Sequence, residues 1–148
     1  MICLRAYSSA RMISAMMMDV DTLIQAVADG TRLRALVLLT REESLCVCEL
    51  TAALDVSQPK MSRHLAALRA LGVVEDSRVA NRVFYRLHPA LPDWARGVID
   101  HLTAGVTATH DFGVIAARLQ AMPNRPAERA EFDRAAVVVE GEEIGHAV

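Results

Sequence analysis

The stretch from Leu45 to Leu71 constrains the fold more than any other, because its apolar spacing predicts two short helices joined by a tight turn. Apolar residues at helical spacing mark the first helix, up to Leu54, and Asp55-Val56-Ser57 then interrupts it and offers Ser57 as the N-cap of the second helix. In the second helix, apolar residues recur at intervals of three and four and would face the core. They are Met61, Leu65, Leu68 and Leu71. Two helices joined by a turn of about three or four residues make a helix-turn-helix candidate.

The outward face of this second helix is polar and basic near its N-terminus, where a recognition helix contacts base edges and phosphates. The whole chain is not basic, because its formal net charge is −2. Residues 57–88, however, carry six basic side chains against two acidic ones, which suits a phosphate-facing surface. Residues 121–148 carry three arginines against six acids and would be repelled by DNA. The candidate DNA-binding residues of the helix are Gln58, Lys60, Ser62 and Arg63.

Two short strands are predicted after the second helix. Gly72 is a natural C-terminal stop for that helix, and Val73–Val79 and Val83–Leu87 then alternate around a short turn. A hairpin directly after a recognition helix is a wing. Arg78 and Arg82 flank its tip and are expected to reach the adjacent DNA backbone or minor groove.

The other patterned segments predict helices. Hydrophobic residues make up 53% of the chain, but the aromatic ones are only one Trp, two Tyr and three Phe, which favours a helical core over a sandwich or barrel. Helices are expected at Val20–Ala28 and Arg32–Leu39, separated by Asp29-Gly30-Thr31, and from Asp93 to about Leu119. The last segment has so much apolar surface that we expect a partner subunit. Its candidate core and dimer residues are Trp94, Val98, Ile99 and Leu102.

These elements predict one mainly α domain with a small β-hairpin, a winged helix-turn-helix that forms a homodimer through its terminal helices. Two-fold symmetry suits DNA, because paired recognition helices read half-sites about one helical turn apart. We expect a flexible N-terminal extension at 1–18, a DNA-binding and dimerisation domain at 19–120, and a flexible C-terminal tail at 121–148. No segment offers the ~18 to 20 apolar residues that a membrane helix needs. Methionines at positions 12, 16, 17 and 18 leave the natural start codon open.

Cys3, Cys46 and Cys48 carry the most distinctive chemistry of the chain. An odd number of cysteines, two of them only one residue apart, does not make a disulfide framework and favours a reducing cytoplasm. Cysteine sulfur is a soft ligand, so the pair would select thiophilic ions such as As(III), Sb(III), Cd(II), Pb(II) or Zn(II). On a regular helix Cys46 and Cys48 would point about 200° apart. Binding one ion is therefore expected to distort the first reading helix and to lower the affinity for DNA.

Four short motifs follow one another along the chain. They are DGTRL (29–33), LCVCEL (45–50), SQPKMSRHL (57–65), and YRLHP (85–89) followed by Pro92 and Trp94. With these motifs in this order, the chain resembles the ArsR (arsenical-resistance operon repressor) family of winged-helix metal sensors over roughly residues 23–102, and most of all its arsenite-responsive repressors. The resemblance implies a homodimer that binds double-stranded operator DNA and releases it when As(III) or Sb(III) binds Cys46 and Cys48. It implies neither an enzymatic activity nor an obligatory cofactor.

One departure from the family pattern leaves the inducer open. The clearest arsenite-responsive members carry a third cysteine three residues after the second, where this chain has Thr51. As(III) favours three ligands, so hydroxide, a small thiol or Cys3 would have to complete the site. The cadmium- and lead-sensing branch also has a Cys-Val-Cys here and completes its site with N-terminal cysteines. A Cd(II)-, Pb(II)- or Zn(II)-responsive repressor that uses Cys3 is therefore an alternative.

An enzyme and a dimerisation module are the two other classes of protein to compare with the repressor. Cys-x-Cys lacks the spacing of the C-x-x-C redox motif, and the chain shows neither a Gly-rich phosphate loop nor paired catalytic carboxylates, so no enzyme is expected. A dimerisation module that binds no DNA is a more remote alternative, which the basic residues of the second helix argue against.

Overall fold

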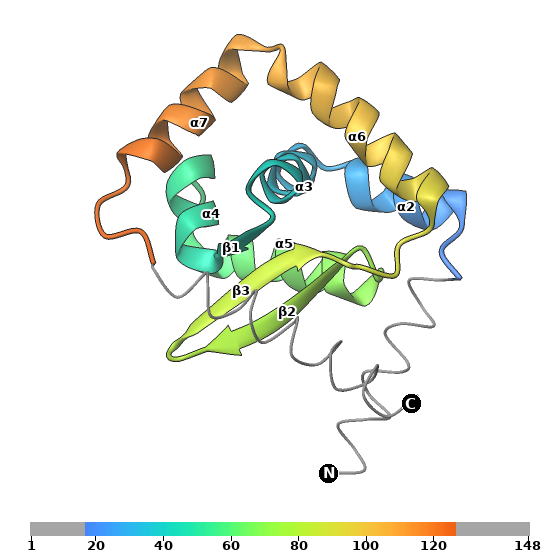
Figure 1. The fold of residues 1–148 in the computed structure, drawn as a ribbon, viewed down its shortest axis with the longest axis horizontal. Coiled ribbons are helices and arrows are strands. Elements are labelled where there is room, and N and C mark those ends of the chain that lie inside the picture. Colours follow the sequence, from blue (N-terminus) through green and yellow to red (C-terminus); the bar gives the residue numbers. More distant parts are fainter. Residues whose placement is uncertain (1–16, 127–148) are drawn as a thin grey trace, which may run out of the picture.

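The computed structural model describes residues 17–126, in which six helices and three strands follow one another along the chain (Figure 1). The elements are α2 Val20–Val27, α3 Gly30–Glu42, β1 Ser44–Cys46, α4 Val47–Leu54, α5 Gln58–Ala70, β2 Val74–Val79, β3 Arg82–Leu87, α6 Asp93–Thr107 and α7 His110–Ala121. The mainly α class with a small hairpin is therefore confirmed.

Helix α3 lies in the middle of the molecule, and α6 and α7 arch over it in Figure 1. Residues 35–39 of α3 are all buried, because helices pack against more than one side of α3. The same core takes leucine and isoleucine side chains from the other helices: Leu23, Leu50, Leu65, Leu68, Ile99 and Leu119. The two helices of the reading motif thus share one hydrophobic core with the terminal helices. Because this core is closely packed, a shift of one helix displaces side chains of the others.

The break between α2 and α3 forms at the predicted Asp29. Its carboxylate accepts hydrogen bonds from the backbone N–H groups of Thr31 and Arg32, at 2.9 and 3.0 Å, and so satisfies donors that a helix start leaves unpaired. The Arg32 side chain then reaches back to the carbonyl oxygens of Ala26 and Gln25 at the end of α2. These bonds set the angle at which α2 meets α3.

Helices α4 and α5 form the predicted helix-turn-helix. Asp55 ends α4 in the left-handed conformation (φ 53°, ψ 47°), which Asp tolerates better than most residues other than Gly. Ser57 is the N-cap of α5, as expected, but its side chain makes no capping hydrogen bond, and Pro59 occupies the first turn. Gly72 has a φ of 79° and turns the chain from α5 into the hairpin.

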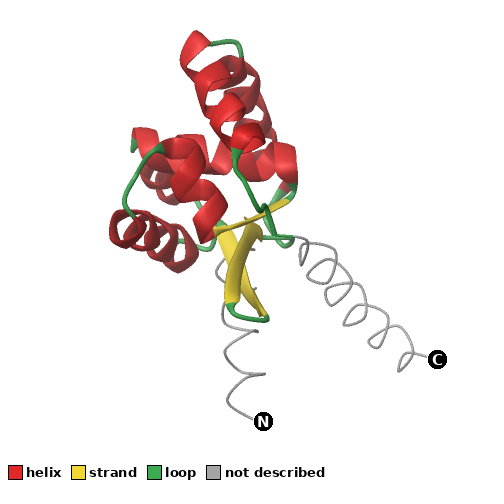
Figure 2. Cartoon of the chain, turned by 90° about the vertical axis from the view of Figure 1, so that its left-hand side faces the viewer, coloured by secondary structure: helices red, strands yellow, loops and turns green. Residues whose placement is uncertain are grey.

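The sheet has three antiparallel strands in the order β1-β3-β2, one more than the sequence predicted. The hairpin of β2 and β3 is confirmed, and Figure 2 shows it projecting away from the helices. The expected helix start at Leu45 is wrong, because residues 44–46 instead extend along β3, with Cys46 opposite Phe84. A three-residue strand has too little pattern of its own, and the open edge of β3 decides its conformation.

The apolar segment after Pro92 is two helices. Thr109 separates them, and its hydroxyl both donates to the Val106 carbonyl and accepts the Phe112 N–H, so it ends α6 and caps α7. In α6, Ile99 is buried in the core, whereas Trp94 and Val98 are 41% and 39% exposed. None of the helices in residues 17–126 combines the length and the hydropathy that crossing a lipid bilayer requires.

Candidate functional site

The outer face of α5 presents the four candidate DNA-binding residues together. Gln58, Lys60, Ser62 and Arg63 are all exposed, while Met61, on the opposite side of the same turn, is fully buried. The burial of Met61, Leu65 and Leu68 orients the helix, so the polar side chains must face away from the protein. The predicted division of α5 into a core face and a polar outer face is thus confirmed.

The two wing arginines lie in different surroundings. Arg78 on β2 is exposed, as a residue that contacts DNA backbone should be. Arg82 is half-buried, and its Nη1 lies 3.5 Å from Sγ of Cys48, a residue 34 positions earlier in the chain. The structure therefore brings one wing arginine together with the predicted thiol site and leaves the other in solvent.

The two cysteines meet at the start of α4. Cys46 is the last residue of β1 and the N-cap of α4 (φ −80°, ψ 163°), and Cys48 lies in the first turn of the helix. Their sulfurs are joined in a disulfide, with the Cα atoms 5.4 Å apart. This disulfide differs from the expectation, which the number and spacing of the cysteines gave, that they make no disulfide framework. The expected divergence of the two side chains by about 200° is wrong because it assumed a helical Cys46, whose extended backbone instead turns its sulfur toward Cys48.

Glu49 stabilises the start of α4 through two hydrogen bonds with Cys46. Cys46 Sγ accepts the Glu49 N–H at 3.4 Å, and Glu49 Oε2 accepts the Cys46 N–H at 2.9 Å, which makes a capping box with sulfur in place of a hydroxyl. The Glu49 side chain is fully buried. The sequence analysis missed this residue, although the Cys46-x-x-Glu49 spacing is that of a capping box and could have identified it.

Arg125 pairs with the buried Glu49 carboxylate. Its Nε donates to Glu49 Oε1 at 2.9 Å, and its Nη2 donates to Glu42 Oε2 at 3.3 Å. Burial acts to lower the pKa of Arg125, but hydrogen bonds and charge attraction to the two glutamates outweigh it and the pKa is raised. Residues 122–126, which the sequence analysis placed in the tail, therefore return to α3 and the start of α4.

A small apolar cluster supports the sulfurs from the side of the sheet. Cys46 and Phe84 are both buried, and the half-buried Cys48 and Val79 pack against them. Phe84 and Val79 belong to the two wing strands. The thiol site thus sits between the first reading helix and the wing, in contact with both.

The described residues supply no third ligand to complete a metal site with Cys46 and Cys48. Thr51, at the position of the third cysteine of arsenite-responsive relatives, donates its hydroxyl to the Cys48 carbonyl at 2.8 Å. Within residues 17–126, no three His, Cys, Asp or Glu side chains are grouped to hold an ion. Cys3 lies outside the described residues.

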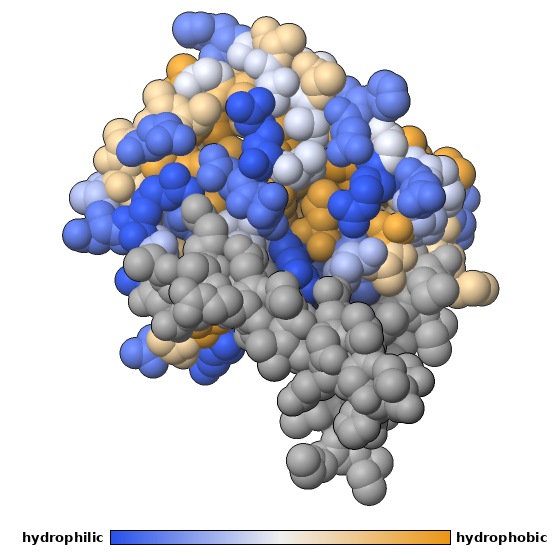
Figure 3. All heavy atoms as spheres, viewed as in Figure 1, coloured by the Kyte–Doolittle hydropathy of each residue, from blue (hydrophilic) through white to orange (hydrophobic). Residues whose placement is uncertain are grey.

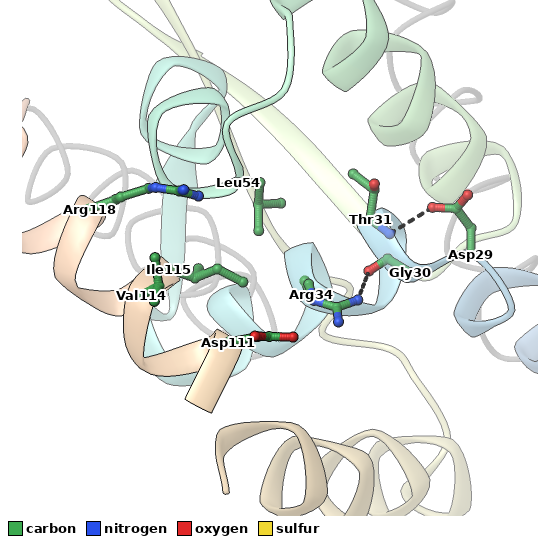
Figure 4. Close-up of a pocket in the computed structure, with 9 residues that line it drawn as sticks. All are labelled: Asp29, Gly30, Thr31, Arg34, Leu54, Asp111, Val114, Ile115 and Arg118. Atoms are coloured by element: carbon green, nitrogen blue, oxygen red, sulfur yellow. Dashed lines mark hydrogen bonds between the residues drawn. The ribbon is translucent and has the colours of Figure 1, made fainter. Parts of the chain in front are cut away.

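A groove of about 500 Å³ opens beside the C-terminal end of α4 (Figure 4). It lies between the start of α3 and one face of α7, where Asp29 and Asp111 balance Arg34 and Arg118. The predicted thiol ligands and DNA-binding residues are all absent from its lining. We therefore do not include the groove in the functional site.

Apolar side chains remain exposed on the terminal helices. Figure 3 shows hydrophobic patches among hydrophilic side chains on the side of α2 and α6. Of the four candidate dimer and core residues, Trp94 and Val98 are exposed, Leu102 is half-buried and Ile99 belongs to the core. The exposed large hydrophobic residues on or next to these two helices are Met17, Val20, Ile24, Trp94 and Val98.

Known proteins are similar to this chain in sequence. A family described as "Bacterial regulatory protein, arsR family" matches residues 29–76. An arsenic resistance transcriptional regulator of Pseudomonas putida is 52% identical over 80 residues, which cover 51% of this chain and 62% of that protein. The arsenical resistance operon repressor of Escherichia coli is 50% identical over 78 residues, which cover 53% of this chain and 67% of that protein.

A solved structure agrees with these sequence relatives. The AntR antimony-specific transcriptional repressor is similar with a TM-score of 0.51 and 26% identity, covering 59% of this chain and 76% of the other. The chain spans between 62% and 67% of the two curated relatives, and the family match over residues 29–76 contains the helix-turn-helix. From the order of its elements and from these matches, the chain belongs to the arsR family of bacterial regulatory proteins.

Proposed function

We propose that this protein is a transcriptional repressor that binds operator DNA as a homodimer and releases it when As(III) or Sb(III) binds the reduced thiols of Cys46 and Cys48. One observation carries the proposal: the two sulfurs meet at the first turn of α4, the helix that supports the DNA-reading helix α5. The names of the arsenic- and antimony-related relatives support the choice of inducer.

Release follows from the capping role of Cys46. Its sulfur accepts the Glu49 N–H and so belongs to the structure that starts α4. An ion bound to both reduced thiols uses a lone pair of the Cys46 sulfur and fixes its position, so this sulfur no longer accepts the Glu49 N–H and the first turn of α4 is displaced. Because α4 and α5 share one core, a displaced α4 shifts α5 on the DNA. The metalloid then binds the DNA-free form better than the DNA-bound form, as an inducer must.

The disulfide must be reduced before it can ligate an ion. A phosphine reductant with water converts the disulfide into two thiols and is itself oxidised to the phosphine oxide. Unlike a dithiol, it does not compete for As(III) with sulfur of its own. We expect the oxidised protein to stay on operator DNA when As(III) is added and the reduced protein to be released.

The second copy of the chain would cover the exposed apolar side chains of α2 and α6. Exposed hydrophobic residues that lie together are typical of a surface that a partner covers. A dimer would also place two α5 helices on successive half-sites. Sedimentation equilibrium of the protein and its Trp94→Ala variant would test this surface, and the variant should dissociate at higher protein concentration than wild type.

Fluorescence-anisotropy titration on promoter DNA tests the inducer site. Cys46→Ser keeps a good N-cap residue but removes the soft sulfur ligand. Cys48→Ser removes the other sulfur, in the first turn of α4. Both variants should bind operator DNA and lose most of the As(III)-induced release. If both are released like wild type, the inducer binds elsewhere.

The same titration separates the two candidate inducer classes. As(III) release that is unchanged in Cys3→Ser would mean that the third ligand is hydroxide or a small thiol. Release that requires Cys3, or that follows Cd(II) and not As(III), would support the Cd(II)-, Pb(II)- or Zn(II)-responsive alternative. Zn(II) and Pb(II) titrations complete the comparison.

A further inference from the structure

The thiol site touches the wing as directly as it touches the helix-turn-helix. Arg82 begins β3 beside the turn of the hairpin, and its guanidinium nitrogen lies 3.5 Å from Cys48 Sγ. Two residues further along β3, Phe84 is paired in register with Cys46 and buried with it. Strand β3 therefore contacts the cysteine pair twice, through the Arg82 side chain at Cys48 and through the backbone pairing of Phe84 with Cys46.

We propose that Arg82 is a positioning residue that couples the thiol site to the wing, so that metalloid binding at Cys48 moves the wing as well as α5. This inference rests on the proposed function and names a second route by which the inducer lowers DNA affinity. The metal-free protein holds Arg82 against Cys48, which anchors the wing near its turn in the DNA-binding position.

Arg82 and a bound As(III) compete for the sulfur of Cys48. A guanidinium keeps its positive charge at all ordinary pH values and approaches an acceptor through N–H groups. In the structure the acceptor is a disulfide sulfur, which stands in for the sulfur of the reduced protein at the same residue. When arsenite, As(OH)3, binds, an As–S bond replaces an As–O bond, and the thiol proton leaves with the hydroxide as water. A positively polarised arsenic atom then lies beside the sulfur. Arg82 must then move away, and β3 moves with it.

The opposite strand supplies a matched control. Arg78 lies on β2, pairs in register with Val83 next to Arg82, and is exposed. Replacing either arginine by Met removes the same charge from the wing, so both variants should show a similarly weaker salt dependence, and Arg82→Met should lose more operator affinity because the wing also loses its anchor. Only the Arg82→Met substitution removes the contact with Cys48.

The measured quantity is the coupling ratio, the operator Kd with saturating As(III) divided by the Kd without it, in reduced protein. We expect this ratio to fall about 2- to 30-fold in Arg82→Met, the range for removal of a coupling residue, and to keep its wild-type value in Arg78→Met. Arg82→Lys keeps the charge but not the planar fork, and its ratio should lie between those of wild type and Arg82→Met.

Amide hydrogen exchange of the wild-type protein tests the inference without any substitution. As(III) added to the reduced, DNA-free protein should raise the exchange of the amides of residues 79–84 at least as much as those at the start of α4. Unchanged exchange in the wing, or equal coupling ratios in Arg82→Met and Arg78→Met, would overturn the inference. If wild type shows no As(III)-induced release at all, the proposed function itself fails, and this outcome is distinct from a failure of the Arg82 contact.

Discussion

Helices α4 and α5 belong to one helix-turn-helix, but the candidate DNA-binding residues of α5 are on the surface whereas the candidate sensor residues of α4 make contacts inside the protein. The candidate DNA-binding residues of α5 are exposed, and its N-cap side chain makes no capping hydrogen bond. The start of α4 is buried and tied to a strand, to the wing and to Arg125. A DNA-reading surface must be free to meet its ligand, whereas a sensor acts only if its ligand disturbs contacts that the rest of the protein uses.

Removal of the buried carboxylate at the start of α4 should have the largest effect. Glu49→Ala takes away the acceptor of the Cys46 N–H and leaves Arg125 without its buried partner. Because Arg125 is partly exposed and can regain water, we expect a loss of about 3 kcal/mol in the free energy of unfolding, at the lower end for a broken buried pair. Urea denaturation measures it. Asp100→Ala, on the exposed side of α6, is the control and should change stability by less than about 0.5 kcal/mol.

Removal of two cations from α5 should affect binding without affecting stability. Lys60→Ala with Arg63→Ala is expected to weaken operator binding by about 10- to 100-fold and to flatten its salt dependence, because fewer counterions are released from the phosphates. Anisotropy titrations over a series of salt concentrations measure both effects. Arg118→Ala, on α7, removes an exposed charge away from the reading face and should change neither. Undiminished operator binding by the double variant would show that these two side chains do not contact the DNA, whereas a wild-type protein that fails to bind the operator would favour a module that does not bind DNA.

The N-cap of α3, Asp29, is intermediate between the buried start of α4 and the exposed face of α5. Its side chain is half-exposed but accepts two backbone hydrogen bonds. The backbone N–H of Arg32 lowers the pKa of the Asp29 carboxyl, and burial opposes this only in part. Asp29→Ala should cost about 1 kcal/mol at neutral pH. Because the pKa is lower in the folded protein, this stabilisation is complete above the unfolded pKa of about 3.9 and is lost as the pH falls through the folded value. The difference between wild type and variant should therefore shrink in acid.

The N-cap of α5 should matter least. Ser57 occupies the cap position but makes no capping hydrogen bond, so Ser57→Ala should change the free energy of unfolding by less than about 0.5 kcal/mol. Thermal unfolding of the two proteins measures this difference. A loss near 1 kcal/mol would show that Ser57 does cap the helix in solution, and the contrast between the two helix starts would be weaker than proposed.

Local patterns in the sequence were sufficient for much of the fold. The spacing of apolar residues, Asp29 as a cap and Gly72 as a stop predicted the helices, the wing and the outward face of α5. Each of these features depends on residues within a few positions of one another, where helix periodicity and turn chemistry act directly. For the same reason the four candidate DNA-binding residues of α5 could be identified before the structure was known.

The placement of the cysteines depends on the folded protein. Residues 44–46 are extended because β3 offers them an open edge, and this backbone brings the two sulfurs together. The contacts of Arg82 with Cys48 and of Arg125 with Glu49 join residues 34 and 76 positions apart. The chain alone was enough to predict the helix-turn-helix, the wing and a pair of cysteines one residue apart. Strand β1 and the distant side chains around the cysteines come from the folded core, because contacts across such separations leave no periodic trace in the chain.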